Sequence, residues 1–219
     1  GEAFDQALAF LEGLPARPVP GRAGLAELRA ALGGPLPERP LDPLEVVAEL
    51  ATAAEPGVVA SSGGRYFGFV VGGATPAALA ADWLTSAWDQ NAALYVLGPA
   101  ASVVEEVAGA WLAELLGLPA GVSVGLVTGG QMANYTGLAI ALRELLDRAG
   151  WDLESDGLWG APRVRVLAGQ GRHGTIDRAL RFLGAGAVEA VDADDQGRLR
   201  PAALAAALDR GSGPAIVCA

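Results

Sequence analysis

The sequence GLVTGGQMAN, residues 125–134, decides the fold, because a short apolar run leads into two glycines and then into a helix-forming segment. It predicts a strand over 122–127, a glycine turn, and a helix over 132–149. Such a turn places backbone N–H groups and the positive end of a helix dipole where they bind an anion such as phosphate. Gly129 and Gly130 let a phosphate approach the backbone closely. An ordinary tight turn between strand and helix is the alternative.

A second turn carries the single histidine of the chain. In RHGTIDRALR, residues 172–181, His173 follows a strand expected over 164–167 and precedes a helix expected over 175–183. The chain has no lysine, which excludes a P-loop, and the turn over 125–134 lacks the Gly-x-Gly-x-x-Gly dinucleotide fingerprint. Two such turns in order are more specific than one. A surface or helix-cap residue is the alternative interpretation of His173.

The second half of the chain alternates strands with helices. Further strands are expected over 187–191 and 215–218, with a helix over 201–209 between them. This alternation predicts an α/β domain with a mostly parallel sheet that helices cover. The acidic segment 192–197 lacks the terminal glutamate and the spacing of a calcium loop, and predicts a solvated turn. An exposed loop is expected over 147–162.

The first part of the chain predicts helices. Phe4, Leu8 and Leu11 share one face of a short helix that Gly13 ends, and residues 14–24, rich in proline and glycine, predict an extended arm. A second helix is expected over 41–52. Its start signals are Asp42 as N-cap and Pro43 at the first helical position. Later signals are Thr75-Pro76 and the capping box Ser102-x-x-Glu105, and the tryptophans Trp83 and Trp111 are expected in the core.

Taken in order, several motifs resemble those of the pyridoxal-phosphate (PLP) decarboxylases of the aromatic amino acid and glutamate decarboxylase family. RPV, residues 17–19, resembles a segment of that family's dimerising arm. RYFGF, residues 65–69, resembles the loop His-Pro-x-Phe-Phe-x-Phe/Tyr that borders the substrate pocket, although Gly63-Gly64 replace His-Pro. Asn91 and GPAASVVE, residues 98–105, are similar to the family's Asn and Ser-Pro-Ala-x-Thr-x-x-Glu, with glycine in place of the first serine.

The two turns carry the most specific part of the resemblance. GGQMAN, residues 129–134, is similar to the family's Gly-Gly-x-x-x-Asn phosphate turn, and HGTIDRA, residues 173–179, matches its His-x-Ser/Thr-x-x-Lys/Arg-Ala. The resemblance implies PLP as cofactor and His173 as the catalytic residue that stacks on the pyridine ring. It implies cofactor contacts at Gly129, Gly130, Gln131, Met132 and Thr175. Phe69 and Val70 would shape a substrate pocket whose apolar wall favours an aromatic or other bulky amino acid.

The resemblance also implies a fold and a division into domains. The fold is the aspartate aminotransferase-like PLP fold type I, in which an N-terminal helical arm precedes the first part of the sheet. We expect a dimerising arm over 1–60 and the first part of the cofactor-binding domain over 61–219. In the family, the aspartate that pairs with the pyridine nitrogen and the lysine that carries the cofactor follow the strand over 215–218. We therefore expect a C-terminal half, as a separate chain or a missing segment, without which this chain is inactive.

Composition excludes several classes of protein. The 219 residues are 52% hydrophobic, enough to bury a sizeable core, and the net charge of −10 argues against binding to nucleic acid. No apolar run is long enough to span a membrane, and no basic segment precedes an apolar one at the start, so we expect a cytoplasmic protein. Cys218 is the single cysteine, which excludes an internal disulfide and, with one histidine, a metal site.

We therefore expect a PLP-dependent carboxy-lyase that decarboxylates an amino acid and acts as a homodimer. Two alternatives stay open. One is another enzyme of the same fold, an aminotransferase or a lyase, because the residues that would separate these activities lie outside this sequence. The other is a non-catalytic structural subunit or inactive fragment, which the absence of lysine supports.

Overall fold

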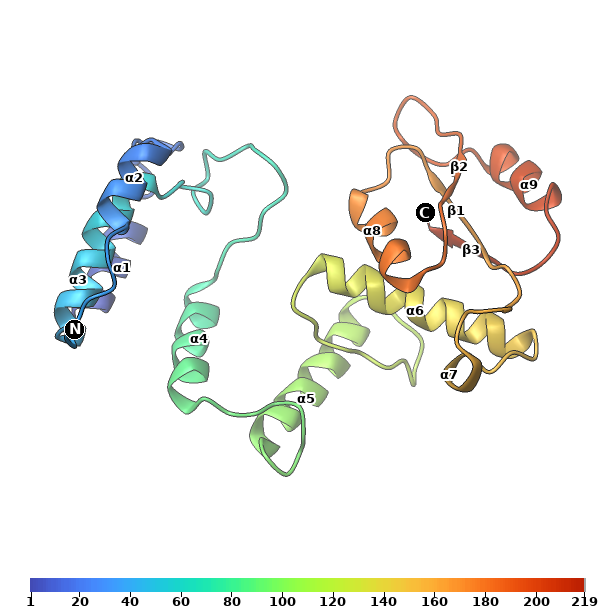
Figure 1. Ribbon diagram of the computed structural model, residues 1–219, viewed down its shortest axis with the longest axis horizontal. Helices are drawn as coiled ribbons and strands as arrows, with labels where there is room; N and C mark the ends of the chain where they lie inside the picture. The colour runs from blue at the N-terminus through green and yellow to red at the C-terminus, as the bar shows by residue number, and fades with distance from the viewer. Residues whose placement is uncertain (219) are drawn as a thin grey trace. The chain divides into compact units, whose positions relative to one another are not determined.

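The computed structural model describes residues 1–218, and this part of the chain divides into the compact units Gly1–Asn91 and Ala92–Ala219 (Figure 1). The first unit is helical, and the second contains both helices and strands. The expected division at residue 60, into an arm and a cofactor-binding domain, stays a prediction.

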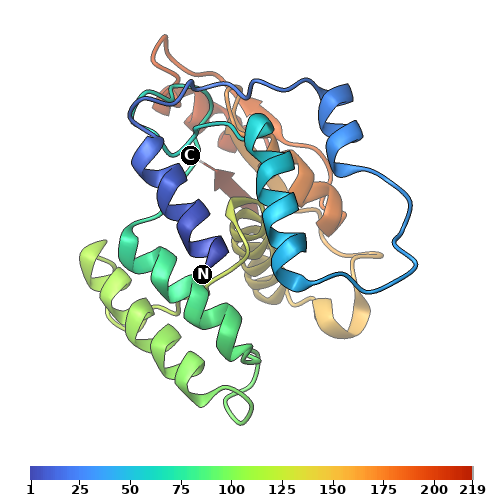
Figure 2. The same cartoon turned by 90° about the vertical axis from the view of Figure 1, so that its left-hand side faces the viewer.

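The first unit is built from helices α1 (Glu2–Gly13), α2 (Leu25–Leu32), α3 (Pro43–Ala54) and α4 (Pro76–Trp88), with a short 3₁₀ helix η1 (Glu55–Gly57) after α3. Helix α3 packs against both α1 and α2, and Figure 2 shows the loop that joins α2 to α3. The Asp42 side chain accepts hydrogen bonds from the backbone N–H groups of Leu44 (2.8 Å) and Glu45 (3.4 Å), which confirms the predicted N-cap of α3. Helix α2 was not predicted, because glycine at its N-cap gives no side-chain signal.

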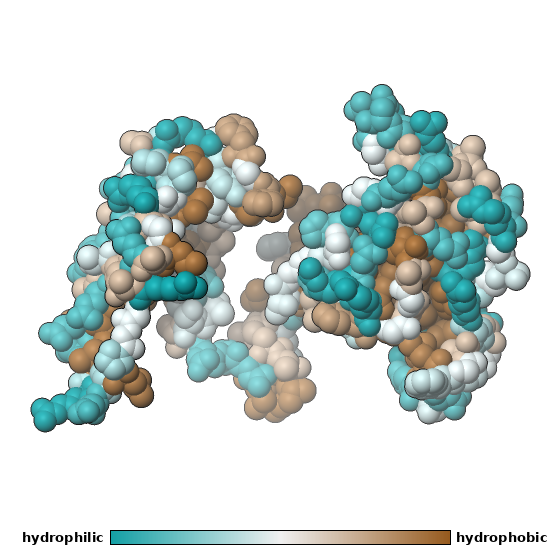
Figure 3. Space-filling view, turned by 45° about the horizontal axis from the view of Figure 1, so that its top comes forward, coloured by the Kyte–Doolittle hydropathy of each residue, from teal (hydrophilic) through white to brown (hydrophobic). Residues whose placement is uncertain are grey.

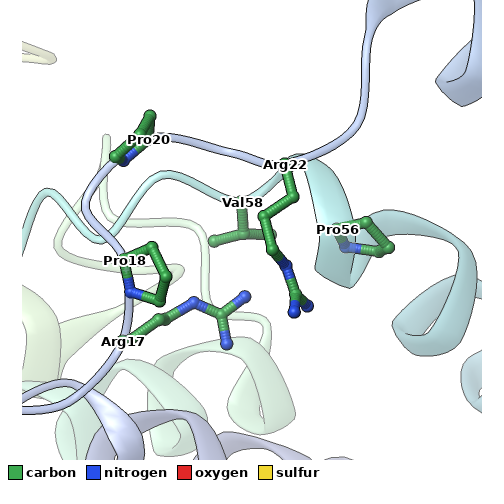
Figure 4. Close-up of a pocket in the computed structure, with 6 residues that line it drawn as sticks. All are labelled: Arg17, Pro18, Pro20, Arg22, Pro56 and Val58. Atoms are coloured by element: carbon green, nitrogen blue, oxygen red, sulfur yellow. The ribbon is translucent and has the colours of Figure 1, made fainter.

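Ion pairs fasten the extended segment after α1 to the end of α3. Arg17 Nη2 lies 2.6 Å from Glu55 Oε1, and Arg22 Nη2 lies 2.7 Å from Glu55 Oε2. Figure 4 shows both guanidinium groups directed into the space between the two segments. The hydrogen bond from Arg17, followed by the charges of Arg17 and Arg22, lowers the pKa of the Glu55 carboxyl despite a smaller opposing effect of desolvation. This pairing gives the proline-rich segment a fixed course.

The second unit begins with helices α5 (Pro99–Leu115), α6 (Gly130–Arg148) and α7 (Leu153–Asp156). Helix α5 starts at Pro99, so the predicted capping box is wrong: Ser102 lies inside the first turn, where its hydroxyl donates to the Gly98 carbonyl (3.1 Å). Proline suits the first helical position because its missing N–H would have no partner there. This earlier signal overrides the later one.

The rest of the second unit alternates strand and helix: β1 (Arg165–Gly169), α8 (Gly174–Leu183), β2 (Glu189–Val191), α9 (Pro201–Asp209) and β3 (Ala215–Cys218). In the described part of the chain, these strands form a parallel sheet in the order β2-β1-β3. On one face, Val166 packs with Leu138 of α6 and Leu180 of α8, whereas Leu167 packs with Ala207 of α9 on the other (Figure 1). The predicted α/β fold with a covered parallel sheet is confirmed.

A buried arginine ties the sheet to α9. Arg165 is 9% exposed, and it donates to both carboxylate oxygens of Glu189 (2.9 and 2.6 Å) and to the Ala207 carbonyl (2.7 Å). The hydrogen bonds from Arg165 lower the pKa of the Glu189 carboxyl. Gly211 lies so close to the guanidinium that a side chain there would overlap it. Charge and close packing together fix this corner of the fold.

Three further predictions differ from the structure. The predicted strand over 122–127 has no assigned secondary structure and pairs with no strand among residues 1–218, and a strand is defined by its ladder partner. Trp83 and Trp111, both expected in the core, are 43% and 66% exposed. The predicted exposed loop over 147–162 contains helix α7 and a half-buried Trp151, whose Nε1–H donates to the Gly157 carbonyl (2.7 Å). The backbone polar groups of the segment 147–162 find hydrogen-bond partners nearby in the sequence. The segment can therefore be ordered without a distant partner.

Candidate functional site

A cavity of about 350 Å³ opens at the carboxyl ends of strands β1 and β3. Gly169 ends β1 and Cys218 ends β3, and the cavity also meets the starts of α6 and α8. In parallel α/β sheets, ligands bind at this edge, because the loops that follow the strands converge there. Its lining residues are Asn134, Gly169, Gly171, Arg172, His173, Ile176, Gly197, Leu199 and Cys218. Burial raises the pKa of the Cys218 thiol, so this side chain acts as an apolar wall.

His173 occupies the N-cap of α8. Its Nδ1 accepts a hydrogen bond from the Thr175 backbone N–H (3.2 Å) and lies 3.0 Å from the Thr175 hydroxyl oxygen. Arg172, just before His173, forms an ion pair with Asp177 in the first turn of α8 (2.7 Å). The imidazole is exposed beside the cavity, while Thr175 is 8% exposed. The histidine therefore has one nitrogen engaged by the fold.

Two side chains of α6 join its first turns to the start of α8. Asn134 Nδ2 donates to the Thr175 hydroxyl (2.7 Å), and Gln131 Nε2 donates to the Thr175 carbonyl (3.2 Å). Arg178 in turn donates to the Gln131 side-chain oxygen (2.9 Å). Gln131, Thr175 and His173 are thus brought into one network. Asn134 closes the Gly-Gly-x-x-x-Asn motif but was not among the predicted site residues.

The glycine turn before α6 is open. Gly129 is the N-cap, with a φ of 155° that other residues rarely adopt, and no side chain among residues 1–218 caps this helix. Gly129 and Gly130 are exposed and Met132 is 43% exposed. The first N–H groups of a helix have no partner within the helix, so an uncapped start suits an anion.

Phe69 and Val70 belong to the first compact unit, in a loop over 58–75 that has neither helix nor strand. Phe69 is 96% exposed and has a φ of 43°, which is unusual for a residue other than glycine. The structure places them in a different unit from His173. Their part in a substrate pocket stays a prediction.

The family follows from residues 26–219, which match the model of the pyridoxal-dependent decarboxylase conserved domain. The chain belongs to this decarboxylase family. It is 26% identical to the aromatic-L-amino-acid decarboxylase of Bacillus atrophaeus over 183 residues, 84% of this chain and 36% of that enzyme. It is 36% identical to the L-2,4-diaminobutyrate decarboxylase of Rhizobium meliloti over 138 residues, 62% of this chain and 26% of that enzyme.

Solved structures of decarboxylases share the fold. The crystal structure of Oryza sativa TDC with PLP and tryptamine covers 99% of this chain with a TM-score of 0.85 at 25% identity. The chain spans 46% of that structure, so less than half its length is represented. The predicted fold type and the predicted cofactor of the family are confirmed.

The described residues of this chain fit part of a PLP site. The uncapped start of α6 suits a phosphate, and the cavity beside His173 has room for a small ring.

Within residues 1–218, no helix combines the length and the apolar character needed to cross a membrane. In the same described range, no cluster of three His, Cys, Asp or Glu side chains could hold a metal ion. The expected cytoplasmic location stays a prediction.

Proposed function

We propose that this chain forms the phosphate- and ring-binding part of a PLP-dependent amino acid decarboxylase. The observation that carries the proposal is the network in which Asn134 and Gln131, from the open start of α6, bond to Thr175 beside His173. The glycine turn before α6 and the histidine thus share one hydrogen-bonded scaffold, of which Asn134 and His173 line the cavity. Family membership and the carboxyl-edge position support the same function.

Each part of the scaffold has a role in this proposal. The N–H groups of Gly130, Gln131 and Met132 hold the phosphate, helped by the dipole of α6. His173 lies against the ring from the side of α8. When bound, PLP supplies the electron sink that lets an amino acid lose its carboxylate as carbon dioxide. The protein orients the ring and shields it from water.

The chain itself has no lysine, so the proposal includes further polypeptide. A lysine that anchors the cofactor has to come from a segment or chain beyond these 219 residues. We infer that the working enzyme is a homodimer, as the resemblance of its arm implies, and that it acts in the cytoplasm. Absence of lysine also favours the second candidate, a non-catalytic subunit that keeps the fold.

The substrate class is a narrower proposal. The two relatives carry different names, one for aromatic amino acids and one for 2,4-diaminobutyrate, so family membership leaves the side chain open. Phe69 and Val70 offer an apolar surface in the loop that resembles the substrate-pocket loop. We therefore propose an aromatic or other bulky amino acid. Assays of carbon dioxide release from tryptophan, tyrosine, glutamate and 2,4-diaminobutyrate would decide between these classes.

The test of the cofactor site uses the protein together with any polypeptide that copurifies with it. PLP is added, the absorbance of the bound cofactor is recorded, and borohydride reduction is followed by intact-mass measurement. We expect the added mass on a lysine of further polypeptide, and a changed absorbance in His173→Ala. Gly129→Ala should weaken binding because it disturbs the turn, whereas the matched control Gly125→Ala, in open space before the turn, should not. A protein that binds no PLP would overturn the proposal and leave the non-catalytic subunit.

A further inference from the structure

Thr175 makes hydrogen bonds with both His173 and Asn134, which line the cavity. It is buried, its backbone N–H and its hydroxyl both face His173 Nδ1, and its hydroxyl also receives Asn134. We propose that Thr175 and Asn134 are positioning residues that hold His173 in one tautomer, with its proton on Nε2. Under the proposed function, this replaces a direct contact of Thr175 with the cofactor.

The backbone gives the first half of the argument. An N–H group can only donate, so Nδ1 of His173 must offer its lone pair to the Thr175 N–H at 3.2 Å. A neutral imidazole has one protonated nitrogen, and with Nδ1 accepting, the proton lies on Nε2. The hydrogen bond that caps α8 therefore also favours the tautomer with its proton on Nε2.

The Asn134 amide gives the second half. Its Nδ2 donates to the Thr175 oxygen at 2.7 Å, which uses an acceptor site of the hydroxyl. The hydroxyl proton is then free to point at His173 Nδ1, 3.0 Å away. The chain of donors runs in one direction, from Asn134 through Thr175 to His173. Both bonds favour the same tautomer.

The surrounding charged groups are engaged elsewhere. Arg172 pairs with Asp177, and Arg178 donates to Gln131, which itself holds the Thr175 carbonyl. These contacts fix the turn around the histidine. In this arrangement His173 meets a ligand as a hydrogen-bond donor from Nε2, and its Nδ1 has no lone pair left to act as a base. The substrate or cofactor atom facing Nε2 is therefore an acceptor.

The tautomer can be read by ¹⁵N NMR of the whole protein labelled at histidine, with the His173 signals assigned by their loss in His173→Gln. We expect Nδ1 at the shift of an unprotonated ring nitrogen and Nε2 at that of a protonated one. Thr175→Val removes the hydroxyl but keeps the backbone N–H, so the second tautomer should become partly populated and Nδ1 should shift part of the way toward the protonated value. Thr175→Ser should restore the wild-type shifts.

Further measurements keep the proposal separate from the function. Thr85→Val removes a helical hydroxyl in the other compact unit and should leave the His173 shifts unchanged. Circular dichroism shows whether each variant folds, and if Thr175→Val does not, Asn134→Leu gives the same test, with a smaller shift expected. A protonated Nδ1 in the wild-type protein, or identical shifts in all folded variants, would overturn the proposal. Because no step needs activity, an inactive protein with the expected shifts would count against the decarboxylase and not against the tautomer.

Discussion

Helices α6 and α8 begin side by side but in opposite ways. His173 caps α8 with a ring nitrogen that accepts from the Thr175 N–H, and Thr175 is buried behind it. Gly129 begins α6 with no side-chain cap among residues 1–218, and both glycines of its turn are exposed. One start is closed by the chain itself, and the other is left for an external anion. The comparison suggests different roles for the two helix starts. The start of α8 fixes the orientation of His173, and the start of α6 offers free N–H groups to a ligand.

The largest expected effect comes from loosening the core that the two helices share. Leu180 of α8 is 1% exposed and packs with Leu138 of α6, so Leu180→Ala should lower the free energy of unfolding by about 2–5 kcal/mol. PLP binding should weaken with it, because the two helix starts lose their common support. Denaturant unfolding measures the first effect and cofactor titration the second. Ile140→Ala, on α6 but 64% exposed, is the matched control and should change neither.

The next effect closes the open start of α6. Gly130→Asp places a carboxylate in the first turn, where it should stabilise the helix slightly and repel a phosphate. We expect the affinity for PLP to fall by about tenfold or more, since two like charges a few ångströms apart repel by more than ~1.4 kcal/mol near a protein surface. Gly130→Asn has nearly the same shape without the charge, so it should lose affinity only through the added bulk in the turn, and less than Gly130→Asp does. Equal losses in both variants would show that space, and not charge, matters.

A smaller effect opens the closed start of α8. His173→Ala removes the cap and should cost about 1 kcal/mol of stability. His173→Asn offers a side-chain oxygen to the same N–H, so it should retain most of that stability while still changing the absorbance of bound PLP. Urea unfolding of the two variants measures the contribution of the helix cap to stability. Their cofactor spectra measure the effect of the imidazole on bound PLP. A His173→Asn protein with a wild-type spectrum would contradict a role for the imidazole.

The smallest effect lies away from both helix starts. Hydrogen bonds from Arg165 lower the pKa of Glu189 below its ordinary value of 4.5. A carboxyl whose pKa is lowered by folding stabilises the protein above its unfolded pKa, and this contribution is lost as the pH falls through the folded one. Glu189→Gln should therefore be less stable at neutral pH and lose less stability on acidification. Unfolding measured from neutral to acidic pH tests this, with the exposed Glu144→Gln as control.

Local signals predicted most of the second unit. Helix α8 and strands β1 and β3 lie close to the expected ranges, because turn residues and apolar runs mark them within a few positions. The open turn at Gly129 and Gly130 was also predicted from local residues. The prediction of a strand over 122–127 was wrong because strand pairing depends on residues far away in the chain, which local residues do not indicate.

The links within the candidate site could not be predicted from the sequence. Asn134 and Thr175 are 41 residues apart, and their hydrogen bond depends on the way α6 packs against α8. Periodicity gives the faces of two helices but not their relative shift along the axis. Sequence motifs predicted a set of site residues, and the structure shows the hydrogen bonds that join Gln131, Asn134, His173 and Thr175.

Arg165 and Gly211 have a consequence for how this chain can vary. A guanidinium lies where a side chain at position 211 would be, and the same group holds Glu189 and the end of α9. A side chain at 211 would force the guanidinium away from Glu189 and the Ala207 carbonyl, and a shorter residue at 165 would leave that buried carbonyl without this donor. In related sequences, we expect a residue with a side chain at position 211 to occur together with a shorter residue at position 165. The two positions should therefore covary in an alignment of such sequences.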